Sequence, residues 1–334
     1  MTDNRRPSVS VIIPAYNGDE FLINCVVTVL KTSYPSFEII IVDNASTDGS
    51  LNRLRKVQAE DHRLNIICNQ KNVGFAKACN LGAINAKGKY LAFLNQDTIV
   101  DKEWIKEAVT VLEKSPEVGA LQSKLMKMDD IRKIDSAGVL INIFGMGLQI
   151  GRGEVDRGQY SIPRQVSSGL GAALFVRRKL FIKLNGFDSL FFVLGEDGDL
   201  CTRIWLAGYK VLYVPSSVVY HKGAMSRSRE SSYFNYYQTL RNSFLLLIKN
   251  LSTPVLVFSL PISVIYRVFR GIIMRYSRDY FTALSSSLVY LIRNYGLICK
   301  KRKQVQSLRV CSDIYLLKQG ILKFVDSNVF INGF

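Results

Sequence analysis

Several acidic side chains and one histidine follow predicted strands or begin a predicted helix, where they could perform acid–base and metal chemistry. Glu196 and Asp197 follow a glycine at the expected start of a helix, and a carboxylate placed there can accept a proton from a hydroxyl group. The triplet Asn95-Gln96-Asp97 directly follows an apolar run at 90–94, and its carboxylate can bind a divalent cation. His221 closes a later apolar run, and imidazole is a common metal ligand. These residue types predict a general base beside a metal site.

Alternating strands and helices predict the scaffold that would bring these residues together. Their spacing is typical of an α/β fold with a doubly wound, mainly parallel sheet, which binds ligands beyond the carboxyl ends of its strands. Because Asn17, Asp43 and Asp97 all follow predicted strand ends, we expect them to meet in one crevice. Residues 119–165, rich in glycine and short alternating stretches, predict hairpins or an irregular insertion. We expect strands over 8–14, 38–42, 64–68, 90–94, 166–178, 210–214 and 217–221, and helices over 19–31, 50–58, 72–86, 102–114 and 200–206.

Positive charge is concentrated in the C-terminal third of the chain. The 334 residues carry a net charge of +17 and are 48% hydrophobic, so a sizeable core is expected and whole-chain disorder is excluded. Residues 223–334 contain 16 Lys and Arg against 4 Asp and Glu, whereas residues 1–222 contain 28 against 23. Because long apolar runs separate these basic residues, we expect an anionic membrane surface as partner and no nucleic acid. A solvated basic helix surface is the remaining alternative.

Residues 256–274 form an apolar stretch that is interrupted by Pro261, Arg267 and Arg270. A membrane-spanning helix needs about 20 mostly apolar residues, and each central arginine costs about 2.5–3.5 kcal/mol. We therefore expect amphipathic helices that lie in the membrane interface, with the basic cluster at 300–303 contacting lipid headgroups. An interface between two copies of the chain, giving a homo-oligomer, is the main alternative for this apolar surface.

The cysteines and the N-terminal residues both indicate a reducing, cytosolic setting. The cysteines form no CxxC pair and lie mostly in apolar patterns, so we expect buried thiols without disulfides. The first 17 residues contain no apolar segment typical of a secretory signal, so we expect none. The six cysteines are Cys25, Cys68, Cys79, Cys201, Cys299 and Cys311.

Five motifs, taken together, resemble one enzyme family. In order along the chain they are VSVIIPAYN, VDNASTDGS, NVGFAKACNLGAINAKGKYLAFLNQDT, SSGLGAALFVRR and GEDGDLCTRIWLAGYKVLYVPSSVVYHK. Each is weakly specific alone, but the five in this order are similar to the family 2 glycosyltransferases with the GT-A fold. More narrowly, they resemble the rhamnosyltransferase- and galactofuranosyltransferase-like branch. The resemblance covers roughly residues 8–250.

The resemblance implies a GT-A catalytic domain over 1–222, with a nucleotide-binding half over about 8–118 and an acceptor half over about 119–222. A basic, apolar helical region follows over 223–334. The implied reaction moves a sugar from a UDP- or dTDP-linked donor to a saccharide acceptor, with inversion at the anomeric carbon. The basic, apolar tail favours a polyprenyl-linked glycan as acceptor and a peripheral or monotopic position on the cytoplasmic face of the cell membrane.

The resemblance also implies roles for individual residues. Asp197 is the expected general base, and Glu196 is expected to bind acceptor hydroxyls. Asp97 and His221 are expected to hold a divalent cation, Mn²⁺ or Mg²⁺, against the donor diphosphate. The expected nucleotide-binding residues are Pro14, Ala15, Tyr16, Asn17, Asp43, Gly74, Lys77 and Gln96, and the expected sugar or acceptor pocket contains Ser168, Gly169 and Gly171.

Some of these residues also have plain structural explanations. Asp43 could form a turn or cap a helix, and Lys77 could be a surface lysine. Ser168, Gly169 and Gly171 could mark a β-bulge or tight strand packing instead of a substrate pocket.

Asn95 departs from the family pattern, which has an acidic residue at this position. Asp97 would then be the main anionic metal ligand, with Asn95 supplying a neutral oxygen. A catalytically silent module that binds sugar nucleotides or glycans is therefore the alternative function. A nucleotide-dependent oxidoreductase would share the sheet pattern, but no GxGxxG motif follows the first predicted strand.

Overall fold

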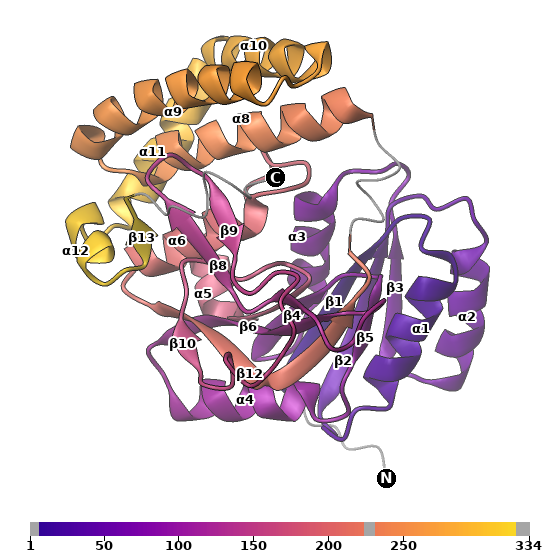
Figure 1. Cartoon of the computed structure of the whole chain (residues 1–334). Helices are drawn as coiled ribbons and strands as arrows, with labels where there is room; N and C mark the ends of the chain where they lie inside the picture. Colours follow the sequence, from indigo (N-terminus) through magenta and orange to yellow (C-terminus); the bar gives the residue numbers. More distant parts are fainter. Residues whose placement is uncertain (1–6, 224–230, 325–334) are drawn as a thin grey trace.

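The computed structural model describes residues 7–223 and 231–324. Within these ranges a central sheet has helices on both faces, and the C-terminal helices form a further layer above it (Figure 1). The strand order is β10-β12-β6-β11-β4-β1-β2-β3, with β5 paired to β12 and β7 paired to β6. Two predictions fall partly outside the described residues. They are the N-terminus without a signal, at residues 1–6, and the C-terminal helical region, at residues 224–230 and 325–334.

The half of the sheet built from the N-terminal residues is parallel, as the alternating pattern predicts. Strand β1 pairs in parallel with β2 and β4, and β2 pairs in parallel with β3. Helices cover both faces of the sheet, and a hydrophobic core lies on each face. Side chains alternate along β1, so Ile12 packs in one core and Val11 and Ile13 pack in the other. The elements are β1 (Val9–Ala15), α1 (Asp19–Leu30), β2 (Phe37–Asp43), α2 (Ser50–Glu60), β3 (Leu64–Cys68), α3 (Phe75–Asn85), β4 (Tyr90–Leu94), β5 (Thr98–Val100) and α4 (Trp104–Lys114).

The other half of the sheet is mixed, and it corrects two sequence predictions. The strand predicted over 166–178 is confined to β11 (Ala173–Arg177), which is antiparallel to both β4 and β6 (Val118–Lys127), while the residues before it form a loop. The strands predicted over 210–214 and 217–221 are one strand, β12 (Lys210–His221). A register shift in its parallel pairing with β6 accounts for the apparent break.

The segment at 119–165 contains the hairpins that its pattern predicts, and these contact the end of the described chain. β8 (Val139–Asn142) and β9 (Gly147–Gln149) are antiparallel, and β13 (Leu322–Lys323) joins them as a third strand. The shorter elements are β7 (Ile134–Ser136), β10 (Arg164–Gln165) and α5 (Arg178–Lys183).

The C-terminal helices pack on the sheet domain through α8. In Figure 1 this layer, coloured orange to yellow, lies over α6 (Glu196–Leu206), and α8 contacts α6, α9, α10 and α11. These contacts cross the domain boundary that the sequence predicts at residue 222, and the boundary itself stays a prediction. The helices are α8 (Ser232–Asn250), α9 (Thr253–Ile273), α10 (Arg278–Arg293), α11 (Tyr295–Ser307) and α12 (Asp313–Lys318).

The expectation of buried thiols is correct for only half of the cysteines. All six are free, but Cys68 is exposed because it ends β3 at the edge of the sheet, and Cys299 and Cys311 are half-buried. The buried thiols are Cys25, Cys79 and Cys201.

Candidate active site

One cavity gathers the acidic and imidazole side chains that the sequence singles out. It lies at the carboxyl ends of β1 and β4 and has a volume of about 380 Å³. Asp97, Asp197 and His221 line it together, although they are far apart in the chain, and Glu196 lines it as well. The crevice expected from strand polarity is therefore present with Asp97 in its lining, but Asn17 and Asp43, which the sequence also predicts there, are not among its lining residues.

Strand pairing places His221 beside Asp97. His221 ends β12 opposite Thr98 of β5, and the backbone amide of Lys222 donates to the Asp97 carbonyl at 3.0 Å. His221 Nε2 consequently lies 3.5 Å from Asp97 Oδ1, with both side chains nearly buried.

Asp135, which the sequence analysis does not single out, orients the imidazole ring. Its Oδ2 lies 2.9 Å from His221 Nδ1, which leaves Nε2 directed toward Asp97. Burial alone would lower the pKa of His221, but hydrogen bonds to Asp135 and Asp97 outweigh it and raise the pKa to about 9. A single acid in the three-residue strand β7 has no motif around it, so its role emerges only from the fold.

Asp97 and His221 could hold a divalent cation if a bound substrate supplied the remaining ligands. Asp97 offers a carboxylate oxygen and His221 an imidazole nitrogen, and a carboxylate behind the second ring nitrogen is the usual support of a metal-binding histidine. The side-chain amide of Asn95 lies beside the ring, with Nδ2 3.3 Å from His221 Nε2. Across residues 7–223 and 231–324, no group of three or more His, Cys, Asp and Glu side chains could hold an ion. A bound cation would therefore need phosphate oxygens and water as further ligands.

Glu196 and Asp197 begin α6 directly after a strained turn. Leu194 and Gly195 both have left-handed backbone conformations, with φ of 71° and 88°. This conformation is readily available to glycine but costs leucine about 1–2 kcal/mol, so the surrounding structure must hold it. The turn places both residues in the lining of the cavity.

The two carboxylates have different hydrogen-bond environments. Asp197 Oδ2 accepts from the Gly171 amide at 3.0 Å, and Oδ1 accepts from the Gly198 amide at 2.7 Å. Glu196 Oε2 is buried and has no hydrogen-bond partner among the described residues. Burial raises the pKa of Asp197, and burial followed by the charge of Asp197 raises the pKa of Glu196 to about 8. Because two backbone amides favour the ionised form of Asp197, whereas Glu196 Oε2 has no hydrogen-bond partner among the described residues, Glu196 is the member of the pair that more readily stays protonated.

Several of the predicted nucleotide- and sugar-pocket residues line the same cavity. Gln96 fixes the loop after β1, because its Oε1 accepts from the Tyr16 amide at 2.9 Å and its Nε2 donates to the Tyr16 carbonyl at 3.0 Å. Gly74 has a φ of 83°, and a Cβ at this position would lie 2.4 Å from the Phe192 carbonyl oxygen, so protein packing already requires glycine. The predicted residues that line the cavity are Pro14, Ala15, Tyr16, Gly74, Gln96 and Gly171.

Asn17 and Asp43 lie beside the cavity rather than in its lining. Asn17 Oδ1 accepts from the Thr47 amide at 2.8 Å, and Asp43 Oδ2 accepts from the Ser46 amide at 3.2 Å. Both side chains therefore stabilise the loop after β2, and this is the turn-forming alternative considered for Asp43.

Three further predicted residues lie outside the cavity lining. Lys77 is exposed on α3, and Ser168 is buried beside β8. A Cβ on Gly169 would lie 2.8 Å from side-chain carbons of Gln122 and Leu174, so this glycine serves close packing, the alternative considered for the segment.

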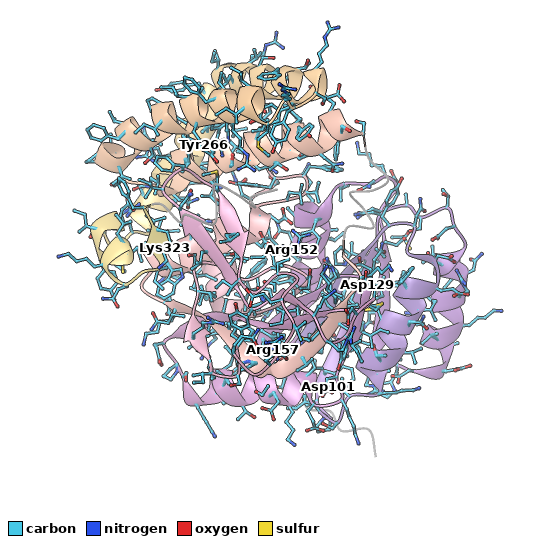
Figure 2. The ribbon with its side chains drawn as sticks, in the orientation of Figure 1. Asp101, Asp129, Arg152, Arg157, Tyr266 and Lys323 are labelled. Atoms are coloured by element: carbon cyan, nitrogen blue, oxygen red, sulfur yellow. The ribbon has the colours of Figure 1, made fainter. Side chains whose placement is uncertain are left out.

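The cavity also contains residues to which the sequence assigns no role, although three of them, Asn44, Asn72 and Phe75, lie within the quoted motifs. Arg152 and Gln149 come from the segment predicted as hairpins, and Figure 2 labels Arg152 near the centre of the view. Gln149 Oε1 is buried without a hydrogen-bond partner among the described residues. The unanticipated lining residues include Asn44, Asn72, Phe75, Asp135, Gln149, Arg152, Phe192, Phe234 and Asn235.

The chain is similar in sequence to bacterial proteins named for the biosynthesis of cell-surface polysaccharides. The O-antigen biosynthesis protein RfbC of Myxococcus xanthus is 30% identical over 247 residues, which are 70% of this chain and 19% of that protein. The putative teichuronic acid biosynthesis glycosyltransferase TuaG of Bacillus subtilis is 35% identical over 127 residues, which are 38% of this chain and 50% of that protein. The chain thus spans half or less of the length of these curated relatives.

Solved structures share the fold at low sequence identity. The mannosyltransferase PcManGT from Pyrobaculum calidifontis, in complex with GDP-Man and Mn²⁺, has a TM-score of 0.55 and 18% identity over 91% of this chain and 86% of that chain. Residues 1–349 of S. aureus TarS, in complex with UDP-GlcNAc, have a TM-score of 0.59 and 16% identity. The match covers 94% of this chain and 92% of that chain. This likeness establishes a mixed α/β fold with a mostly parallel central sheet of the GT-A type.

Two family models match the sequence itself. The N-terminal domain of galactosyltransferase matches residues 154–226. Glycosyl transferase family 2 matches residues 10–184, which are just over half of the 334 residues. The chain therefore belongs to glycosyl transferase family 2.

Proposed function

We propose that the protein is an inverting glycosyltransferase that moves a sugar from a nucleotide-diphosphate donor to a saccharide acceptor. The observation that carries this proposal is the presence of Asp97, Asp197 and His221 in one cavity. Similarity to relatives named for O-antigen and teichuronic acid biosynthesis supports a role in making a cell-surface polysaccharide. UDP and dTDP are the donor nucleotides that we favour, and the rhamnosyl- or galactofuranosyl-transferase-like branch stays a prediction.

The proposed reaction is a single displacement. Asp197 accepts the proton of an acceptor hydroxyl while the oxygen attacks the anomeric carbon, and the bond from that carbon to the diphosphate breaks with its electron pair leaving on the nucleotide. Attack opposite the leaving group inverts the anomeric configuration without a covalent enzyme intermediate. Glu196, neutral because its pKa is about 8, donates a hydrogen bond to the acceptor. A divalent cation held by Asp97 and His221 would neutralise charge on the diphosphate.

The proposal is tested by nucleotide release from a panel of UDP-, dTDP- and GDP-sugars, with Mn²⁺ and membrane extracts as the acceptor source. We expect release from one donor class that depends on added acceptor. A catalytically silent binding module is the second candidate, because Asn95 replaces an acid and its side-chain amide lies beside His221. Binding of a nucleotide sugar without release across the whole panel would favour that candidate.

Asp97 and Asp135 are expected to affect nucleotide binding through the cation. Asp97→Asn removes the anionic ligand and should abolish the gain in nucleoside diphosphate affinity that Mn²⁺ provides. Asp135→Asn should reduce that gain by about 10–100-fold, because losing the support of a metal-binding histidine has effects of this size. Isothermal titration of UDP, dTDP and GDP, with and without Mn²⁺, measures both effects. Exposed Asp129 provides the control Asp129→Asn, and equal Mn²⁺ dependence in all three variants would refute the assigned ligands.

We further propose that α9 and its neighbours bind an anionic membrane surface, where a polyprenyl-linked acceptor would be found. α9 is long and apolar enough to cross a membrane by length and composition. Its outward residues Phe258, Ile262, Ile265 and Phe269, spaced by three or four positions, are 47–71% exposed and form one apolar face. Such a face favours a helix lying in the interface.

The arginines within α9 do not interrupt this apolar face. Arg267 is 2% exposed and donates to Ser263 and to the Phe144 carbonyl, and Arg270 is likewise buried. Both arginines turn toward the protein, so they interrupt the apolar stretch in the sequence but not the exposed face of the helix.

The basic residues at 300–303 are split between the two sides of α11. Lys301 Nζ lies 3.3 Å from Asp188 Oδ1, and Arg302 donates to the Leu251 carbonyl at 2.6 Å, so neither projects freely. Lys300 and Lys303 are exposed and available to lipid headgroups.

Replacing the apolar face should weaken membrane binding. The triple variant Phe258→Ser, Ile265→Ser, Phe269→Ser should reduce partitioning onto phosphatidylglycerol-containing liposomes by at least about tenfold, since each buried apolar side chain contributes about 1.5–3 kcal/mol. Flotation measures this, and size-exclusion chromatography with light scattering reports the oligomeric state. A matched control replaces Ile84, Ile162 and Ile182, which lie elsewhere on the surface and are 56–77% exposed, with serine. Unchanged flotation with loss of a dimer would instead assign the face to self-association.

A further inference from the structure

The turn that carries the catalytic acids is held from outside by the C-terminal helix α8. We define the catalytic turn as residues 193–197, which lead from a loop into α6. Its Leu194 and Gly195 are left-handed, a conformation that a leucine keeps only when neighbouring groups fix it. The contacts that fix this turn therefore bear directly on where Glu196 and Asp197 point.

Asn242 of α8 binds two successive carbonyls of the catalytic turn. Its Nδ2 donates to the Val193 carbonyl at 2.8 Å and to the Leu194 carbonyl at 2.5 Å. The side chain is 2% exposed, so water does not compete for these bonds. Its Oδ1 accepts from Arg241 Nε at 3.0 Å, which sets the amide in the orientation that directs both N–H groups at the turn.

Arg241 is in turn fixed by its own neighbours. Its guanidinium donates to Gln238 Oε1 at 2.6 Å and to the Leu190 carbonyl at 3.3 Å, and it lies 5.1 Å from the ring centres of Tyr237 and Tyr290. Asn242, Arg241 and Gln238 thus form a connected polar network, and each side-chain donor and acceptor of Asn242 has a partner.

A second contact from α8 reaches the first turn of α6. Lys249 Nζ lies 2.7 Å from Asp199 Oδ1 and 2.6 Å from Asp188 Oδ2, and Asn250 Nδ2 donates to Asp199 Oδ1 at 3.0 Å. Asp199 lies two residues after Asp197, so α8 binds backbone carbonyls before the catalytic acids and a side chain after them.

We propose that α8 is a positioning element of the active site and that Asn242 is its principal positioning residue. The inference rests on the proposed function, since it takes Asp197 to be the base. Asn242 touches neither substrate nor reacting atoms; it acts by fixing the carbonyls of a left-handed turn so that Asp197 reaches the acceptor hydroxyl. The helical region that the sequence indicates as a membrane attachment is therefore also part of the catalytic scaffold.

Removing the amide donors should lower turnover without changing nucleotide binding. We expect Asn242→Leu, which keeps the side-chain size and loses both N–H groups, to lower kcat by at least about 100-fold, because small misplacements of a catalytic group cost this much. The KM for the donor and the Mn²⁺-dependent affinity for UDP, dTDP or GDP should stay within about twofold of wild type. Hydrogen exchange should become faster in peptides covering 190–200 while exchange in β1 and β4 is unchanged.

A matched control replaces another amide that clamps a backbone segment. Asn80 donates to the Phe187 carbonyl at 2.8 Å and accepts from its amide at 2.9 Å, outside the catalytic turn. Asn80→Leu should keep kcat within about fivefold of wild type. Where Asn242→Leu does not fold, Asn242→Asp, which retains the size and the acceptor for Arg241, takes its place.

The outcomes separate this inference from the function that it builds on. Equal kcat for the Asn242 and Asn80 variants, or unchanged exchange at 190–200, would overturn the positioning role. A decrease in nucleotide affinity as large as the decrease in kcat would overturn it too, because that result indicates general damage. If Asp197→Asn retained full transfer, the assignment of the base would fail, whatever Asn242→Leu does.

Discussion

Asp197→Asn is expected to lower the transfer rate by about 10²–10⁴-fold, the usual contribution of a positioned general base. The amide cannot accept the acceptor proton, and although it keeps the size of the carboxylate, its one oxygen can accept from only one of the two backbone amides, Gly171 or Gly198, that bind separate oxygens of Asp197. We therefore expect a small loss of stability, whereas the Mn²⁺-dependent nucleotide affinity should be retained. Acceptor-dependent nucleotide release measures the loss, and Asp129→Asn at an exposed site controls for the substitution.

Glu196→Gln should give a much smaller loss, below about tenfold, because the neutral amide resembles the protonated form that Glu196 holds near pH 7. Burial and the neighbouring Asp197 raise the pKa of Glu196 to about 8, so its ionised form is the minor one at neutral pH. The difference between the two variants tests the assignment of roles. Severe loss in Glu196→Gln with near-normal turnover in Asp197→Asn would transfer the base to Glu196.

Lys249→Met should destabilise the protein by about 3–5 kcal/mol at pH 7, because removing one member of a buried ion pair leaves charges without compensation. The Lys249 side chain is 1% exposed and contacts both Asp188 and Asp199. Chemical denaturation monitored by circular dichroism measures the change. The control Lys301→Met removes the other lysine that contacts Asp188. Because the Lys301 side chain is 30% exposed, this variant should lose less than about 1 kcal/mol of stability.

The effect of Lys249→Met should depend on pH in a defined direction. Burial would raise the pKa of Asp199, but Lys249 and Arg203 outweigh it and hold the pKa far below its usual range. A carboxylate with a lowered folded-state pKa contributes stability above its unfolded pKa of about 3.9 and loses it as the pH falls. The stability difference between wild type and variant should therefore narrow below about pH 4. A difference that stayed constant from pH 7 to pH 3 would show that Lys249 stabilises the fold through packing alone.

The parallel half of the sheet is predictable from the sequence because its strands are short, apolar and regularly separated by helices. The predicted strands at 64–68 and 90–94 coincide with β3 and β4. Prediction is less successful where tertiary pairing decides the outcome. An apolar run from 166 onward has the composition of a strand, yet only Ala173–Arg177 forms a strand, while Ser168 makes an isolated bridge to Val139 and the loop that follows brings Gly171 to Asp197.

The site is predictable only as far as its motifs extend. Asp97, Asp197 and His221 lie in motifs. Asp97 and His221 share the cavity because β4 and β12 end at the same edge of the sheet, and Asp197 joins them from the first turn of α6. Asp135 and Asn242 lie in no motif. Each acts by a hydrogen bond to a residue far away in the sequence, so only the folded structure shows that the two residues of the bond lie together. For the same reason, composition indicates that Arg267 and Lys301 belong to a basic surface, although each is paired with protein groups.

The most direct test of the shared site is a crystal structure of the protein with Mn²⁺ and the nucleoside diphosphate that binds it best. The account predicts an anomalous peak within bonding distance of Asp97 and His221 Nε2, with the diphosphate on the metal and its terminal phosphate facing Asp197. A nucleotide bound elsewhere, or a metal without contact to Asp97 and His221, would contradict it.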